Sequence, residues 1–136
     1  MARDDEARSL LKGMERQPRV DEREAAVLAE AMRRGSWASG LVANGAVADE
    51  GSPAQAVAAR GEAARRRLIE GNQRLVASVA SEYRDRGLPF DKVIEAGNDG
   101  LVRAVDHFDW SRAPEFPTYA AAHIREAIAS AVAAGG

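Results

Sequence analysis

The sequence contains no cysteine among its 136 residues. This absence excludes disulfide frameworks, zinc sites built from thiolates and cysteine nucleophiles. Aromatic residues make up only 5% of the chain and Thr118 is its only threonine, whereas alanine occurs 29 times. Because alanine favours helices while β-branched and aromatic residues favour strands, the composition predicts an all-α protein. Its core is expected to consist of leucine, valine, isoleucine and alanine.

Long apolar runs and a strong net charge are also missing. No stretch approaches the roughly 20 apolar residues that a membrane-spanning helix needs, so no membrane partner is expected. The opening residues, MARDDEARS, are too charged for a secretory signal. The formal net charge is −2. No global field therefore draws the chain to nucleic acid, and any DNA binding must use a local patch or a partner protein.

Apolar residues in the first half of the chain recur at helical spacing. We expect a short helix over residues 4–16, stopped by Pro18. A second helix is expected to start after Asp21, which opens an Asp-x-x-Glu start signal, and to end at Gly35. Residues 36–53 lose the periodicity and are rich in glycine, so they are expected to form a loop or linker.

The second half predicts three further helices. A long helix is expected from Ala54 to about Arg86, ended by Gly87. The next should be capped by Asp91, and Gly97 and Gly100 on one of its faces would allow a neighbouring helix to approach closely.

The last expected helix opens at Pro117, since proline suits the first helical position. It should run to Gly135, after a polar connection over residues 109–116. The whole pattern predicts an all-α, compact helical bundle of about five helices.

Motifs for catalysis or metal binding are not evident. The two histidines, His107 and His123, are not at the spacing with which helical histidines pair on a metal. The sequence contains neither a phosphate-cradling glycine loop nor a serine nucleophile elbow. These observations argue against an enzyme and predict no metal or organic cofactor.

The segment from Asp106 to Tyr119 gathers four of the seven aromatic residues of the chain, and arginines flank it. Aromatic rings interleaved with arginine can stack on unpaired bases. Alternatively, the rings close the bundle where a loop crosses it. Spacing alone leaves both interpretations open for Phe108, Trp110, Phe116 and Tyr119.

Residues 68–119 read LIEGNQRLVASVASEYRDRGLPFDKVIEAGNDGLVRAVDHFDWSRAPEFPTY. This stretch resembles region 2 of the sigma-70 family, the bacterial RNA polymerase initiation factors. The segments that carry the resemblance are colinear with the family pattern: LIE, RLV, RGLPF, GN, GL, AVD, FD and TYA. Residues 5–35 are similar to the segment that precedes region 2 in primary sigma factors.

The resemblance implies a division of the chain into three parts. Residues 1–35 would form an N-terminal helical pair, residues 36–59 a variable loop or linker leading into the long helix, and residues 60–136 a helical domain of the sigma region 2 type. The promoter-reading domains that normally follow, including a helix-turn-helix, are not expected in this chain.

One face of region 2 in this family binds a coiled coil in the largest subunit of the RNA polymerase core. Lys92 and Ala96 each stand where the family has an acid, and Glu95 stands where it has an amide. By position, the resemblance implies polymerase binding for Lys92, Glu95, Ala96 and Asn98.

A second face captures flipped-out bases of the non-template strand at the −10 promoter element. Tyr119 takes the position of the aromatic residue that stacks on the key flipped base. The family's paired tryptophans are Ala122 and His123 here, and Glu115 replaces a lysine. The implied DNA-binding residues are Phe108, Arg112, Phe116, Thr118, Tyr119, His123, Arg125 and Glu126.

Two functions therefore stay open. In the first, the chain is a minimal sigma factor that associates with the polymerase core and contacts the −10 element. In the second, it is a sigma-like regulatory protein that binds polymerase or another regulator without melting DNA. A piece of a longer factor is a third interpretation. The family implies a bacterial, cytoplasmic protein, associated with the nucleoid through polymerase, and suggests an anti-sigma or other regulatory protein as a further partner.

Overall fold

The computed structural model describes residues 2–45 and 51–135. These residues form six α-helices and one 3-10 helix, with no strand among them, which confirms the all-α prediction. The elements are α1 (Ala2–Glu15), α2 (Glu22–Ala43), α3 (Pro53–Glu70), α4 (Gln73–Ser81), α5 (Phe90–His107), η1 (Trp110–Glu115) and α6 (Phe116–Gly135).

The chain divides into two units. Residues 20–68 form the α2–α3 unit, and residues up to 19 together with those from 69 onward form the α4–α6 unit, which also contains α1. None of the described helices is long and apolar enough to cross a membrane.

In the α2–α3 unit, the expected helix start at Asp21 is confirmed. Its side chain accepts a hydrogen bond of 2.8 Å from the backbone N–H of Glu24, which caps α2. The Glu24 carboxylate in turn receives two hydrogen bonds from Arg67 on α3, at 3.0 and 3.1 Å. This two-pronged contact ties the start of α2 to the end of α3.

The expected end of this helix at Gly35 is wrong. A Cβ atom on Gly35 would lie 2.6 Å from the Cα of Gly61, so Gly35 permits a close crossing of α2 and α3 instead of a C-terminal turn. α2 continues to Ala43, and residues 36–43 of the expected loop are therefore helical. Residues 46–50 of that loop lie outside the described residues.

The expected continuous helix over residues 54–86 is also wrong, because it is interrupted after Glu70. Asn72 has φ −116° and ψ 16°, which is outside the helical region, and α4 begins only at Gln73. α4 ends at Ser81, and a turn leads to α5. Within this turn Asp85 (φ 62°) and Gly87 (φ 92°) both adopt left-handed backbone conformations.

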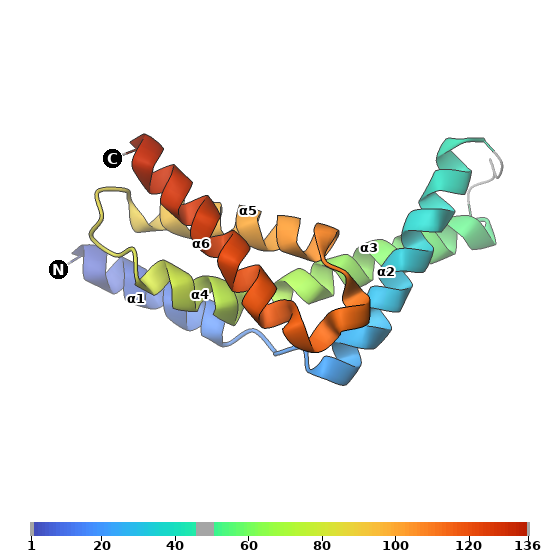
Figure 1. Ribbon diagram of the computed structural model, residues 1–136, viewed down its shortest axis with the longest axis horizontal. Helices are drawn as coiled ribbons and strands as arrows, with labels where there is room; N and C mark the ends of the chain where they lie inside the picture. Colours follow the sequence, from blue (N-terminus) through green and yellow to red (C-terminus); the bar gives the residue numbers. More distant parts are fainter. Residues whose placement is uncertain (1, 46–50, 136) are drawn as a thin grey trace. The chain divides into compact units, whose positions relative to one another are not determined.

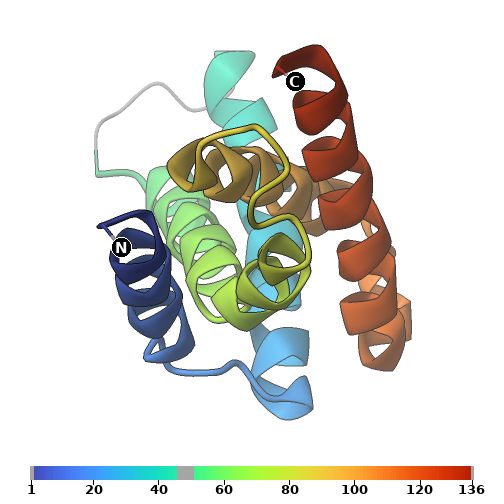
Figure 2. The same cartoon turned by 90° about the vertical axis from the view of Figure 1, so that its left-hand side faces the viewer.

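The core of the α4–α6 unit lies where α4, α5 and α6 meet. α4 runs between α1 and α6, as Figures 1 and 2 show from two directions. The most extensive contact of the unit is between α5 and α6. Its fully buried side chains include Val76, Val93, Leu101, Val105, Ile124 and Ile128.

The expected close approach at Gly97 and Gly100 is confirmed. A Cβ atom on Gly100 would lie 2.7 Å from the carbonyl oxygen of His123 and 2.8 Å from the Cα of Ile124. One on Gly97 would lie 2.8 Å from a methyl group of Val76. Gly100 thus lets α5 approach the backbone of α6, and Gly97 makes room for the side chain of Val76 from α4.

The boundaries of the last two α-helices differ slightly from those expected. Pro89, not Asp91, occupies the N-cap position of α5, and its carbonyl accepts hydrogen bonds of 2.9 and 3.1 Å from the N–H groups of Lys92 and Val93. α6 begins at Phe116, one residue before Pro117.

Candidate nucleic-acid and protein interfaces

Four aromatic side chains pack against one another where α5, η1 and α6 meet. We call Phe108, Trp110, Phe116 and Tyr119 the aromatic cluster. Phe108 lies at its centre, with ring centroids 5.1 Å from Trp110, 5.2 Å from Phe116 and 4.9 Å from Tyr119. Trp110 stacks on Phe116 at 4.6 Å. Separations of this size are typical of favourable aromatic pairs.

The 3-10 helix η1 brings Trp110 into this cluster. Asp109 begins η1, and its carboxylate accepts hydrogen bonds from the backbone N–H of Ser111 (3.1 Å) and from its hydroxyl (2.7 Å). The hydroxyl bond first, and then the backbone bond, lower the pKa of Asp109 below its usual value. The indole N–H of Trp110 donates to the carbonyl of Val105 at 3.2 Å, which fixes the ring against α5.

The side chains of the aromatic cluster differ in their exposure to solvent. Phe116 is only 3% exposed, whereas Phe108, Trp110 and Tyr119 are half-buried. The centroid of the Tyr119 ring lies 4.5 Å from that of His123, which is also half-buried on the next turn of α6. Tyr119 and the adjoining His123 therefore form one of the partly accessible edges of the cluster.

Two exposed arginines near the cluster are paired with acids. Arg112 donates to both carboxylate oxygens of Glu115, at 2.5 and 3.1 Å. Arg125 on α6 donates to Glu82 at 2.8 Å. Each pairing raises the pKa of its arginine through a side-chain hydrogen bond first and through charge attraction second.

The outer side of α5 carries a second group of candidate residues. Lys92 and Glu95 lie one turn apart, with Nζ and Oε2 separated by 3.4 Å, and they are 58% and 65% exposed. Ala96 beside them is half-buried. Because both charged groups are well exposed, their ion pair is weak and leaves each group available to a partner.

A family model described as Sigma-70 region 2 matches residues 68–135. The chain belongs to the sigma-70 family. The matched residues contain α4, α5, η1 and α6, so both candidate surfaces lie within region 2. A sigma-factor-like role in transcription, associated with RNA polymerase, follows from this membership.

Within this sigma-70 region 2, the structure brings together some of the sequence-predicted DNA residues and separates others. Phe108, Phe116, Tyr119 and His123 form one contiguous group. Thr118 and Glu126 lie exposed along α6. Arg112 and Arg125 are exposed as well, but each is held by an acid.

Two predicted contact residues have structural roles that the sequence did not reveal. Phe116 is buried in this conformation and packs against Phe108 and Trp110, while its implied role in base stacking stays a prediction. The side chain of Asn98 accepts a hydrogen bond of 2.7 Å from Gln73 on α4 and donates one of 3.1 Å to the carbonyl of Ile94. Asn98 therefore joins α4 to α5, a role that depends on tertiary contact and has no signal in local periodicity.

The residues that the structure describes contain no group of three or more histidine or carboxylate side chains placed to hold a metal ion. The resemblance of the N-terminal segment and the division of the chain at residues 35 and 59 stay predictions, since the family match begins at Leu68.

Proposed function

We propose that this sigma-70 family protein binds the RNA polymerase core through the outer side of α5 and contacts the non-template strand of the −10 element at the edge of the aromatic cluster. The observation that carries the proposal is the region 2 match over residues 68–135, which spans both surfaces.

The polymerase contact is assigned to Lys92, Glu95 and Ala96, with a coiled coil of the largest subunit as the partner. Opposite charges one turn apart present a mixed electrostatic pattern instead of a single acidic face. A partner helix must match this pattern, because misplaced like charges weaken an interface. Asn98 takes part mainly by holding α5 in place against α4.

The DNA contact is assigned to Tyr119, with Phe108 positioning its ring and His123 at its side. A flipped-out base can stack on a half-exposed aromatic ring, which contributes about 1–3 kcal/mol per base. The exposed hydroxyl of Thr118 next to Tyr119 is suited to accompany that contact by a hydrogen bond to the strand's backbone.

The paired arginines favour the alternative function, a sigma-like regulator that occupies polymerase or pairs with an anti-sigma or other regulatory protein without melting DNA. Arg112 and Arg125 must each leave a carboxylate before contacting a phosphate. Glu126 adds a further acid on α6. Each lost phosphate contact weakens binding to nucleic acid, most strongly at low salt.

The two functions are distinguished by a labelled single-stranded −10 oligonucleotide mixed with the chain, with and without polymerase core. If the chain is a minimal sigma factor, the −10 strand should bind only when both the chain and the polymerase core are present, and a scrambled strand should not bind. If the chain is a regulator that binds polymerase, the complex should form, but its affinity for the strand should equal that of the polymerase core alone. The absence of any complex with polymerase contradicts the minimal sigma factor and leaves only a regulator that pairs with another protein.

A further inference from the structure

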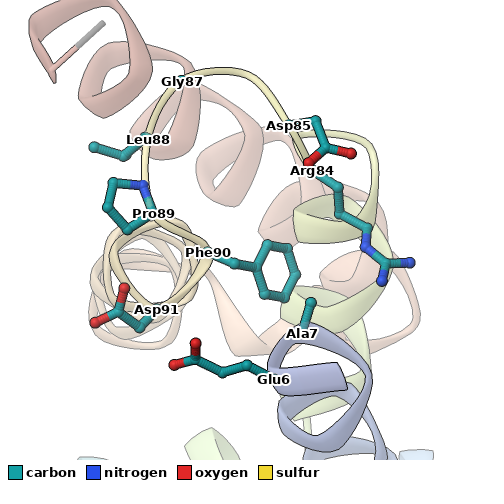
Figure 3. A pocket seen from close by; sticks show the side chains of 9 residues that line it. All are labelled: Glu6, Ala7, Arg84, Asp85, Gly87, Leu88, Pro89, Phe90 and Asp91. Carbon is teal, nitrogen blue, oxygen red and sulfur yellow. The ribbon is translucent and has the colours of Figure 1, made fainter. Parts of the chain in front are cut away.

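A small pocket opens in the α4–α6 unit, between the beginning of α1, the turn after α4 and the beginning of α5 (Figure 3). Its volume is about 190 Å³. A cavity of about 150 Å³ is enough to hold benzene, so this pocket has room for the end of one large side chain.

The inner walls of the pocket are apolar and well defined. Ala7 of α1 and the residues Leu88, Pro89 and Phe90 line it. The guanidinium carbon of Arg84 lies 5.9 Å from the centroid of the Phe90 ring, a cation–π distance that holds this arginine as a side wall. Figure 3 shows the Phe90 ring projecting between α1 and Arg84.

The rim of the pocket is acidic. Glu6, Asp85 and Asp91 contribute three carboxylates against the single guanidinium of Arg84. In Figure 3 the carboxylate of Glu6 extends from α1 toward Asp91 on α5. None of the three acids has an ion pair with another described residue. Three carboxylates against one guanidinium leave the rim with a net negative charge, which favours an incoming cation.

The shape of the pocket is set by the backbone before any partner arrives. Asp85 and Gly87 hold the turn in left-handed conformations, and the carbonyl of Pro89 anchors the first turn of α5 through two hydrogen bonds. A preformed pocket loses less conformational entropy on binding than a flexible loop does.

We infer that this pocket receives an arginine side chain of the protein partner that binds the outer side of α5, an inference that rests on the proposed function. The methylene stem would pack on Ala7 and Phe90, and the guanidinium would reach Glu6 and Asp91. Arginine fits better than lysine because its planar fork can pair with two carboxylates while its stem stays in apolar surroundings.

The same charges disfavour other occupants. A nucleic-acid phosphate would face three carboxylates, which repel it. The described residues provide no set of three ligands for a metal ion at this pocket. Asp91 lies one turn before Glu95 on the same side of α5, so the pocket continues the proposed polymerase surface toward α1 and the turn. The α1 helix thereby becomes part of the interface.

The test compares the full chain with the double variant Glu6→Gln, Asp91→Asn and with the control Glu62→Gln, which alters an exposed acid of α3. In titrations against the polymerase core, the double variant should bind at least about tenfold more weakly, as expected when a charge pair loses its partner. Glu62→Gln should bind like the original chain. Equal binding by all three proteins would overturn the inference that this pocket receives an arginine of the partner, while leaving the proposed function in place.

A second measurement does not depend on polymerase. N-acetyl-L-arginine amide is titrated into the ¹⁵N-labelled chain, with N-acetyl-L-norleucine amide as the apolar control. The arginine probe alone should cause saturable shifts at the backbone amides of residues 84–88, 90 and 91, and these shifts should be lost in the double variant. Identical responses to both probes, or no response, would overturn the inference. If the chain does not bind polymerase at all, the proposed function and the assigned partner fail together.

Discussion

Tyr119 is the residue on which the proposed DNA contact depends most. Its ring is half-buried, lies against Phe108 on one side and approaches His123 on the other. This arrangement fixes the ring and leaves one edge accessible. A rigid, partly exposed ring is suited to stacking because little conformational freedom remains to be lost when a base binds.

Replacing Tyr119 with alanine should reduce the affinity of the polymerase complex for the −10 strand by about 5- to 150-fold, the loss of one base-stacking contact. Affinity for the polymerase core should not change, because Tyr119 is on α6 and the proposed polymerase contact is on α5. Fluorescence anisotropy with a labelled strand measures the first quantity. Tyr119→Phe is the control that keeps the ring, and equal strand binding by the alanine and phenylalanine variants would contradict the stacking assignment.

The arginines beside the cluster are restrained by their acidic neighbours. Arg112 and Glu115 are 65% and 57% exposed, so their ion pair contributes little to stability but still competes with a phosphate for the guanidinium. The same competition applies to Arg125 and Glu82.

Glu115→Gln should therefore strengthen binding of the −10 strand by up to about fivefold, since Arg112 no longer has to leave an ion pair, and an exposed ion pair is weak. The slope of log affinity against log salt should also steepen by about 0.7, as expected for one additional phosphate contact on a single strand. Glu62→Gln changes the net charge equally at an exposed position on α3. If both variants behave alike, Arg112 does not contact the strand.

At the level of the elements, the crossing of α5 and α6 depends on Gly100. The atoms that a Cβ would meet there belong to the α6 backbone, which cannot rotate away as a side chain can. The crossing positions the aromatic cluster, because its rings come from the end of α5, from η1 and from the start of α6.

Gly100→Ala should destabilise the fold by about 1–3 kcal/mol, the usual range for overpacking. Gly13→Ala is the matched control: nothing lies within 4 Å of the added Cβ, and its site is inside α1. Gly13→Ala should stabilise the folded state by about 0.5–1 kcal/mol, because alanine favours the helix interior more than glycine does. Urea unfolding of both variants measures whether their free energies of unfolding change in opposite directions. A neutral or stabilising effect of Gly100→Ala would contradict the described crossing.

The 3-10 helix η1 depends on an ionised Asp109, whose pKa is lowered first by the hydroxyl of Ser111 and then by its backbone N–H. A carboxyl group whose pKa is lower in the folded state than its unfolded value of 3.8 stabilises the folded state at pH values above 3.8. This contribution is lost as the pH falls through the folded pKa. The contacts of Trp110 should therefore loosen only at pH values below about 3.8.

Trp110 fluorescence followed from pH 6 to pH 2 measures this transition. A Trp37→Phe background removes the other indole, which is 70% exposed on α2. Asp109→Asn cannot titrate at this position, so its profile should lack the acid step seen with Asp109. Superimposable profiles would show that the cap does not control η1.

For the molecule as a whole, the sequence predicts the fold class and most helices but not the close contacts between distant segments. Gly97 and Gly100 stand three apart on one face, a pattern that is visible locally, and their role was predicted correctly. Gly35 follows two arginines and looks like a helix end, but its contact is with Gly61 on another helix. Local spacing contains no information about that partner.

The same limit applies to the candidate site. Aromatic spacing identifies the cluster, but it does not distinguish a buried ring such as that of Phe116 from a half-buried ring such as that of Tyr119. The pairing of Arg125 with Glu82 joins α6 to the residue after α4 and could not be predicted from either segment alone. The pocket beside α1 likewise needs three separate segments.

The most direct test of the account is the affinity of the chain for the RNA polymerase core, measured by titrating labelled chain with core. The account predicts saturable binding that Glu95→Lys weakens, because it replaces the acid of the outer α5 surface with a second cation beside Lys92. Glu62→Lys, the same charge reversal on α3, should bind like the original chain. An absence of saturable binding, or equal weakening by both substitutions, would contradict the assignment of α5 as the polymerase-binding surface.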